Sequence, residues 1–212
     1  MNGPLQGVRV FDMTHAALGP WGIMILGAMG ANVIKIETPL GDGIRNMKPR
    51  YNDLAAVYLH CNLGKKGIHL DLKSEEGKQV AKELLIDADV LAENMKWGTI
   101  DRLGLGYEAV SQLNPRIVYG NYPGYGSSGP LKDWGSADPT AQAFSGAVST
   151  TGKRGGEGEF LRWYALHDFN AGSYVVITTL LGLLNRERTS KGIKMESSQV
   201  AASIAVQTSR IA

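Results

Sequence analysis

Residues 8–36, VRVFDMTHAALGPWGIMILGAMGANVIKI, decide the fold class of this chain. The run Val8–Phe11 is short and apolar, which predicts a buried strand. A Gly-Pro step at 19–20 and the apolar stretch Trp21–Met29 predict a helix, since proline is tolerated in the first turn. Asn32–Ile36 alternates and is β-branched, so it predicts a second strand. Such a strand–helix–strand unit predicts parallel strands joined by a right-handed crossover.

Outward from this unit, the chain keeps alternating between the two kinds of element. We expect further strands at 67–72, 90–93, 117–122 and 194–197, and helices at 74–88, 107–113, 139–148 and 168–188. Residues 41–53 and 123–130 are polar and contain glycine, so they predict loops. The alternation predicts an α/β protein with an open, doubly wound, mainly parallel sheet built from Rossmann-like βαβ units.

The composition excludes several classes of protein. Of 212 residues, 43% are hydrophobic and 20% charged, as in an ordinary globular protein, and the net charge of +2 gives no bulk attraction for nucleic acid. The single cysteine, Cys61, excludes an internal disulfide. The first residues lack the pattern of a signal peptide, and the longest apolar segment, Tyr174–Leu184, is too short to cross a membrane. We therefore expect a cytoplasmic protein with no nucleic-acid or membrane partner.

Familiar nucleotide and metal motifs do not fit. Glu37 follows the second strand at the spacing of a dinucleotide-binding acid, but the glycines nearby never form G-x-G-x-x-G. A phosphate-binding loop also fails, because Gly64-Lys65 is followed by Lys66 rather than Ser or Thr. The four histidines are scattered over separate elements, so we expect no metal site.

The most suggestive local feature is Asp138, in the sequence GSADP at 135–139. An aspartate before a proline is a routine helix start, with the aspartate as N-cap. The same geometry also keeps a carboxylate ionised at a helix N-terminus. Glycine-bearing loops at 120–129 and 152–158 could supply N–H donors to an oxyanion, so a nucleophilic carboxylate is the second interpretation.

Motifs spread over nearly the whole chain resemble those of the class III CoA-transferases, the formyl-CoA transferase and carnitine CoA-transferase (CaiB/BaiF-like) group. The matching segments are PLQGVRVFDMTHAALGP, GANVIKIE with GDGIR, NLGKKGIHLDLKSEEGK, ADVLAENMKWGTIDRLGLGYE, LNPRIVYGNYPGYGSSGP, ADPTAQAFSGAVSTTG and HDFNAGSYVVITTLLGLLNRERTSKG. Their number and order make the resemblance specific.

The resemblance implies an enzyme that moves CoA from a donor acyl-CoA to a carboxylic acid. Asp138, with Gln142, Ala143 and Gly146, falls on the family's D-x-x-x-Q-A-x-x-G pattern, which implies that Asp138 is the nucleophile and forms an aspartyl-CoA thioester. Coenzyme A is implied as part of the acyl-CoA substrate, and no metal is implied. The positions implied to contact coenzyme A are His15, Ala16, Ala17, Lys73, Asn94, Met95, Thr99 and Arg102.

The chain also departs from the family pattern. Family members are about twice as long, so we expect a CoA-binding Rossmann-like domain over 1–190 and a segment, 191–212, leading toward a small domain absent from this chain. The resemblance implies an interlocked homodimer, or a heteromer, in the full-length form. Ala17 replaces a glutamine and Thr38 an arginine found in some relatives.

Two alternatives to a transferase stay open. A short chain is also expected of a non-catalytic or truncated CoA-binding subunit of a larger transferase. Related racemases carry a histidine where this chain has Ala137, which disfavours an acyl-CoA racemase or isomerase. Asp168 matches the acidic partner of those racemases, although a helix-capping acid is the plainer interpretation.

Overall fold

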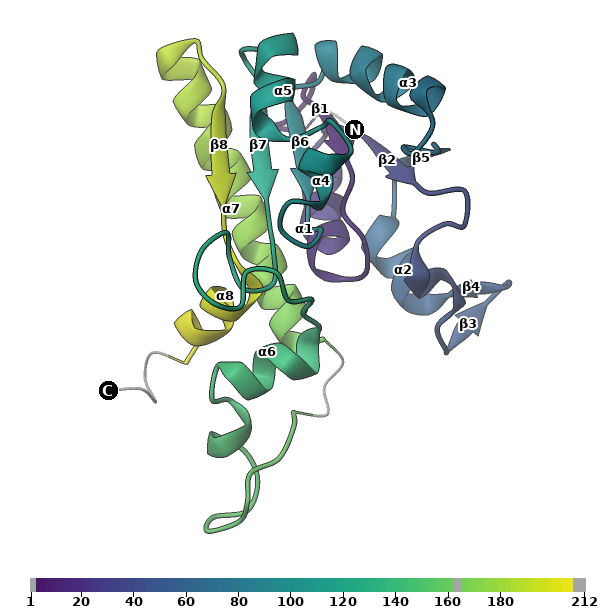
Figure 1. The fold of residues 1–212 in the computed structure, drawn as a ribbon. Coiled ribbons are helices and arrows are strands. Elements are labelled where there is room, and N and C mark those ends of the chain that lie inside the picture. The colour runs from purple at the N-terminus through teal and green to yellow at the C-terminus, as the bar shows by residue number, and fades with distance from the viewer. Residues whose placement is uncertain (1–2, 162–164, 208–212) are drawn as a thin grey trace.

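A single all-parallel sheet organises the protein, whose computed structural model describes residues 3–161 and 165–207 (Figure 1). Its strands are β1 (Arg9–Asp12), β2 (Asn32–Glu37), β5 (Lys66–His69), β6 (Val90–Glu93), β7 (Val118–Asn121) and β8 (Ile193–Glu196). They lie in the order β5-β2-β1-β6-β7-β8. Counted along the chain this is the 3-2-1-4-5-6 order of doubly wound folds, which confirms the predicted fold class.

Helices cover both faces of the sheet. The longer ones are α1 (Leu18–Ala28), α3 (Glu75–Ile86) and α7 (Leu166–Thr189), and the seven-residue α5 (Tyr107–Leu113) lies beside α3. The shorter ones are α2 (Ala56–Asn62), α4 (Thr99–Arg102), α6 (Asp138–Phe144), α8 (Gln199–Ala205) and the 3-10 turns η1 (Gly43–Asn46) and η2 (Val148–Thr150). Helices α1 and α7 pack together on one face, while α3 and α5 contact each other on the other.

The alternation of side chains along the strands produces two core layers. On β1, Val10 packs into the layer under α1 and α7, whereas Phe11 packs into the layer under α3 and α5. On β6, Leu91 lies on the same side as Phe11, and Val90 lies on the same side as Val10. Buried apolar residues on both faces are expected of a parallel sheet covered by helices on both sides.

Two glycines let α1 and α7 cross closely. A methyl group added at Gly22 would lie 2.5 Å from the carbonyl oxygen of Gly172. One added at Gly172 would lie 2.7 Å from the Leu18 carbonyl oxygen and from the ring of Trp21. Neither position can accept a side chain without a shift of the helices, so this crossing fixes where α7 begins.

The structure corrects several expected boundaries. Helix α1 begins at Leu18, three residues before the predicted start. The predicted loop 41–53 contains η1 and the strand β3 (Arg50–Tyr51), which pairs with β4 (Leu54–Ala55). Strand β8 lies within 191–212 and pairs in parallel with β7, so this segment adds an edge strand to the sheet. The boundary with any further domain stays a prediction.

Candidate active site at the start of helix α7

The loops that follow the strands gather at the carboxyl edge of the sheet. The chain order reverses between β1 and β6, and in doubly wound folds ligands bind at this switch point. Here the two loops are joined: the His15 N–H donates to Asn94 Oδ1 at 2.8 Å, and Asn94 Nδ2 donates to the His15 carbonyl at 2.9 Å. The loop after β1 is therefore fixed to the loop after β6.

Asp138 is buried, and its carboxylate is fully engaged. Gln142 Nε2 donates to Oδ1 at 2.5 Å, and Oδ2 accepts the N–H groups of His167 at 2.7 Å and Asp168 at 3.1 Å. The last two groups belong to the first turn of α7, whose N–H groups have no partner within their own helix. Asp138 thus places a negative charge at the N-terminus of a 24-residue helix, where the helix dipole stabilises an anion.

The expected N-cap role of Asp138 is wrong. The N-cap of α6 is Ala137, whose N–H donates to Thr140 Oγ1 at 2.8 Å, and Asp138 is the first residue inside the helix. Its side chain turns instead to α7, whose own N-cap, Ala165, has the left-handed φ of 52° and offers no side-chain acceptor. One helix therefore supplies the cap that the other lacks.

Asp168 is the second carboxylate of the site. Its Oδ1 accepts a hydrogen bond from Gln199 Nε2, and Ser136 Oγ donates to the other end of the same amide. No residue among those described donates to its Oδ2. Burial, with a further contribution from the negative charge of Asp138, raises the pKa of Asp168 to about 7. Since Asp168 is the third residue of α7, whose N-cap is Ala165, the expectation of a plain helix-capping acid is also wrong.

Two adjoining cavities meet at Asp168. One, of about 430 Å³, is lined by Ala16, Ala17, Ile44, Met47, Ala137, Asp138, Pro139, Gln142, Phe160, Leu161, Ala165 and Asp168. The other, of about 220 Å³, is lined by residues that include His15, Ala16, Asn94, Met95, Lys96, Trp134, Ser136, Ala137, Asp168 and Gln199. Ala16, Ala137 and Asp168 line both, so these three residues lie at the junction. The two cavities are called the 430 Å³ cavity and the 220 Å³ cavity below.

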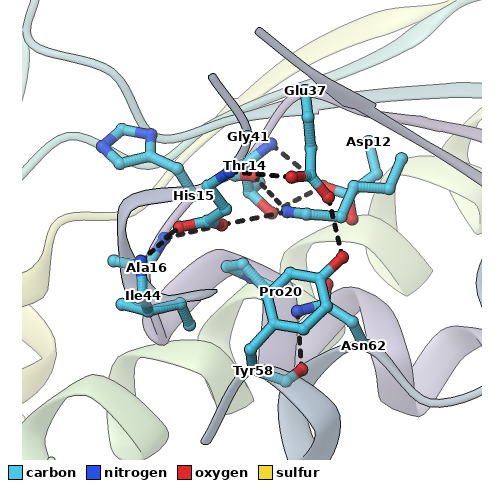
Figure 2. Close-up of polar contacts among 12 residues, drawn as sticks. Asp12, Thr14, His15, Ala16, Pro20, Glu37, Gly41, Ile44, Tyr58 and Asn62 are labelled. Atoms are coloured by element: carbon cyan, nitrogen blue, oxygen red, sulfur yellow. Dashed lines mark hydrogen bonds and ion pairs between the residues drawn. The ribbon is translucent and has the colours of Figure 1, made fainter. Parts of the chain in front are cut away.

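A buried network of charges supports the loop after β1 (Figure 2). Asp42 accepts the N–H of Ala16 at 3.2 Å and lies 3.3 Å from Lys35, whose Nζ donates to the Thr14 carbonyl at 2.8 Å. Ala16 has a left-handed φ of 61°, which is rare for a residue with a side chain. The Asp42 contact therefore holds Ala16 in a strained conformation at the junction of the cavities.

Glu37 belongs to the same network. Its carboxylate accepts from Arg45 at 2.6 and 2.7 Å, from Tyr58 at 2.7 Å and from the Asp42 N–H at 2.7 Å, and Figure 2 shows Tyr58 pointing at it. Both oxygens are occupied, so Glu37 is not free to bind a ribose. At the end of β2, Glu37 therefore holds the loop 41–46 through Asp42 and Arg45.

The expected CoA contacts divide into two groups. His15, Ala16, Asn94 and Met95 line the 220 Å³ cavity, and Ala17 lines the larger one. Lys73, Thr99 and Arg102 line neither; they lie beyond β5 and β6, with Arg102 donating to Thr99 Oγ1 at 3.0 Å. The first group lies at the site, and the second lies farther along the same edge of the sheet.

Sequence reasoning missed several hydrogen-bond donors around the two carboxylates. The N–H donors come from the start of α7 rather than from the glycine-bearing loops. Gln199 donates to Asp168, and Ser136 donates to Gln199; the sequence assigned a role to neither. Gln199 lies 31 positions from Asp168, so no local motif joins them.

In residues 3–161 and 165–207, no group of three or more His, Cys, Asp or Glu side chains could hold a metal ion. Within the same ranges, no helix is long and apolar enough to cross a membrane.

The strand order and the position of the site define a Rossmann-type α/β domain with paired carboxylates at its carboxyl edge. Residues 5–212 match the model of CoA-transferase family III, so the chain belongs to this family. It is 37% identical over 204 residues to the acetyl-CoA:oxalate CoA-transferase of Acetobacter aceti, covering 96% of this chain and 52% of that protein. It is 35% identical over 207 residues to the succinyl-CoA:glutarate CoA-transferase of Mus musculus, covering 97% of this chain and 47% of that protein.

A solved structure agrees in fold. The crystal structure of a CAIB/BAIF family protein from Brucella suis superimposes with a TM-score of 0.94 at 32% identity, covering all of this chain and 57% of that one. The chain thus spans about half the length of the relatives that it matches.

Proposed function

We propose that this chain carries the reactive carboxylate and part of the CoA-binding surface of a CoA-transferase, which moves CoA from an acyl-CoA to a carboxylic acid. One observation supports this most directly: Asp138 and Asp168 meet at the first turn of α7, where two cavities adjoin. Family membership and the names of the similar CoA-transferases support the same reaction class.

The proposed reaction exchanges one thioester for another through acyl-enzyme stages. An aspartate oxygen attacks the thioester carbonyl, the C–S bond breaks, and CoA leaves as a thiolate while the acyl group stays on the aspartate as a mixed anhydride. The thiolate attacks the aspartyl carbonyl and releases the donor acid, leaving an aspartyl-CoA thioester. The acceptor carboxylate attacks that thioester, and the thiolate released then attacks the acceptor carbonyl, which restores the aspartate.

Geometry favours Asp168 as the attacking group. Both oxygens of Asp138 accept hydrogen bonds, so attack by Asp138 would first break contacts with Gln142 or α7. Asp168 is only partly buried, lines both cavities and has an oxygen with no donor among the described residues. We therefore propose Asp168 as the nucleophile and Asp138 as the residue that positions it; the motif-based assignment of Asp138 stays the alternative.

Trapping the intermediate distinguishes the two carboxylates. Borohydride reduces an aspartyl thioester to homoserine, and trypsin separates the two sites because it cuts after Lys153 and Arg162. After incubation with acetyl-CoA, we expect homoserine at position 168. Asp168→Asn should lower CoA transfer by at least about 10⁴-fold, and Asp138→Asn by about 10- to 100-fold. Homoserine at 138, with the larger loss in Asp138→Asn, would restore the motif-based assignment.

The remaining alternatives have their own readouts. A CoA-binding subunit without activity would bind acyl-CoA but give neither turnover nor homoserine at either position in the unmutated chain. A racemase or isomerase would exchange the α-deuterium of a chiral acyl-CoA without any acceptor acid. Ala137 offers no imidazole for that step.

A further inference from the structure

The lining of the 430 Å³ cavity is mostly apolar. Apart from Asp138, Asp168 and Gln142, its side chains are those of alanines and of Ile44, Met47, Pro139, Phe160 and Leu161. No lysine, arginine or histidine among the described residues lines it. An acyl group whose carbonyl reacts at Asp168 has to extend into this space or into the 220 Å³ cavity.

The polar groups of the 430 Å³ cavity are already bound to the protein. Gln142 donates to Asp138 at 2.5 Å and to the Leu161 carbonyl at 3.3 Å, and its oxygen accepts the Leu161 N–H at 2.7 Å. Asp138 is occupied as described above. Within the described lining, what faces an incoming substrate is therefore the carboxylate of Asp168 and apolar surface.

These surroundings oppose a second carboxylate on the substrate. A carboxylate placed there would lose water without gaining a cation or a free N–H donor from the described lining, and it would face two acids of the same charge. An apolar chain meets the opposite conditions, since each buried methylene improves binding by about fourfold.

We propose that this cavity takes an apolar acyl group from a monocarboxylic acid. The inference rests on the proposed CoA transfer and names its substrate class. It sets this chain apart from the two relatives named for oxalate and glutarate, which are dicarboxylic acids. Met47 and Phe160, at the exposed side of the cavity, are specificity-determining residues in this proposal.

A matched pair of acids tests the proposal. Hexanoate and adipate have the same chain length and differ in a terminal methyl or carboxylate group. With acetyl-CoA as donor, we expect kcat/KM for hexanoate to exceed that for adipate by at least about 100-fold, because no described lining residue offers a cation to the second charge. Stabilisation against thermal unfolding by hexanoyl-CoA and adipoyl-CoA gives the same comparison without turnover.

The two readouts separate this inference from the proposed function. If neither acid reacts but hexanoyl-CoA stabilises the chain more than adipoyl-CoA, the transferase proposal fails and the preference stands. If CoA is transferred to adipate as well as to hexanoate, the function stands and the inference is overturned. Equal stabilisation by both thioesters, without transfer, also overturns it.

Two substitutions check where the preference arises. Met47 and Phe160 are both partly exposed, so Met47→Arg and Phe160→Arg can keep the guanidinium in water and leave the fold intact. Each should shift the hexanoate-to-adipate ratio toward adipate by about 10-fold or more, since a cation then faces the second carboxylate. Met47→Leu, which keeps the site apolar, should retain the preference. An unchanged ratio in both arginine variants would refute the assignment of the cavity.

Discussion

Two clusters of acidic side chains, both close to the cavities, differ in what compensates their negative charge. In the network behind the loop after β1, each buried acid has a cation: Asp12 has Lys65 at 2.8 Å, Asp42 has Lys35 at 3.3 Å, and Glu37 has Arg45 at 2.6 Å. At the start of α7, Asp138 and Asp168 have backbone and amide donors, and no ion pair with a described residue.

The pKa values reflect this difference. Burial alone would raise the pKa of Glu37, but hydrogen bonds from Arg45 and Tyr58 outweigh it and lower the pKa to about 2. Burial and the neighbouring charge of Asp138 raise that of Asp168 to about 7. Glu37 therefore stabilises the fold above its ordinary pKa and loses that contribution as pH falls toward 2. The ionised form of Asp168 has the opposite effect and opposes folding as pH rises toward 7. Matched charges stabilise the scaffold, whereas a buried carboxylate with a raised pKa, such as Asp168, is a candidate for a functional group.

The largest expected effect is a loss of stability when one ion pair of the network behind the loop after β1 is removed. Lys65 donates to Asp12 and to the Pro20 carbonyl, both at 2.8 Å, and the Lys65 side chain is 2% exposed. Lys65→Met leaves Asp12 buried without this cation and should lower the free energy of unfolding by about 3–5 kcal/mol, measured by urea denaturation. As control, Arg9→Gln removes the exposed pair with Asp87 and should change little. Similar losses in both variants would contradict the distinction.

A smaller loss of stability is expected at the crossing of α1 and α7, on which the position of Asp138 and Asp168 relative to each other depends. Gly172→Ala adds a methyl 2.7 Å from the Leu18 carbonyl and should lower the free energy of unfolding by about 1–3 kcal/mol. If the proposed function holds, it should also reduce CoA transfer, since the crossing fixes the start of α7, which carries Asp168. Gly67→Ala is the matched control, because a methyl there meets nothing within 4 Å. Thermal unfolding of the two variants checks this, and equal stability would show that α1 and α7 can move apart without cost.

The smallest expected effect concerns the influence of the Asp138 charge on the titration of Asp168. If ionised Asp168 is the nucleophile, activity should fall as pH drops through about 7, because protonation removes the attacking anion. Asp138→Asn removes the neighbouring charge and should move this acid limb lower by about one pH unit. The pH profile of kcat/KM measures it. A limb that stays in place would mean that Asp138 does not influence the titration.

Much of the fold could be predicted from the sequence because its signals are local. The β-branched alternation of Asn32–Ile36 and the capped, amphipathic pattern from Ser74 to Ala88 each depend on neighbouring residues. Helix α2 and the hairpin of β3 and β4 were missed, because they are short and are stabilised by contacts with α1 and η1 rather than by their own periodicity.

The site was harder to predict because its contacts join residues that are far apart in the sequence. His15, Ala16, Asn94 and Met95, which the family resemblance marks as contacts of coenzyme A, line one cavity in the structure. That they contact coenzyme A stays a prediction. Gln142 lies within the motif of Asp138, but the two N–H groups that Asp138 also accepts are 29 and 30 positions away, and they are available only because α7 starts there. A motif records which acid is present; the direction in which its side chain turns is a tertiary property.

The amide of Asn94 behaves as an extra peptide group between the loops after β1 and β6. Its carbonyl and its NH₂ pair with the main chain of His15 as one residue of a sheet pairs with another. The two loops are therefore mechanically coupled at the carboxyl edge of the sheet. A molecule that displaces the backbone at His15 must also move the segment that carries Met95 and Lys96, so both walls of the 220 Å³ cavity respond to a single contact.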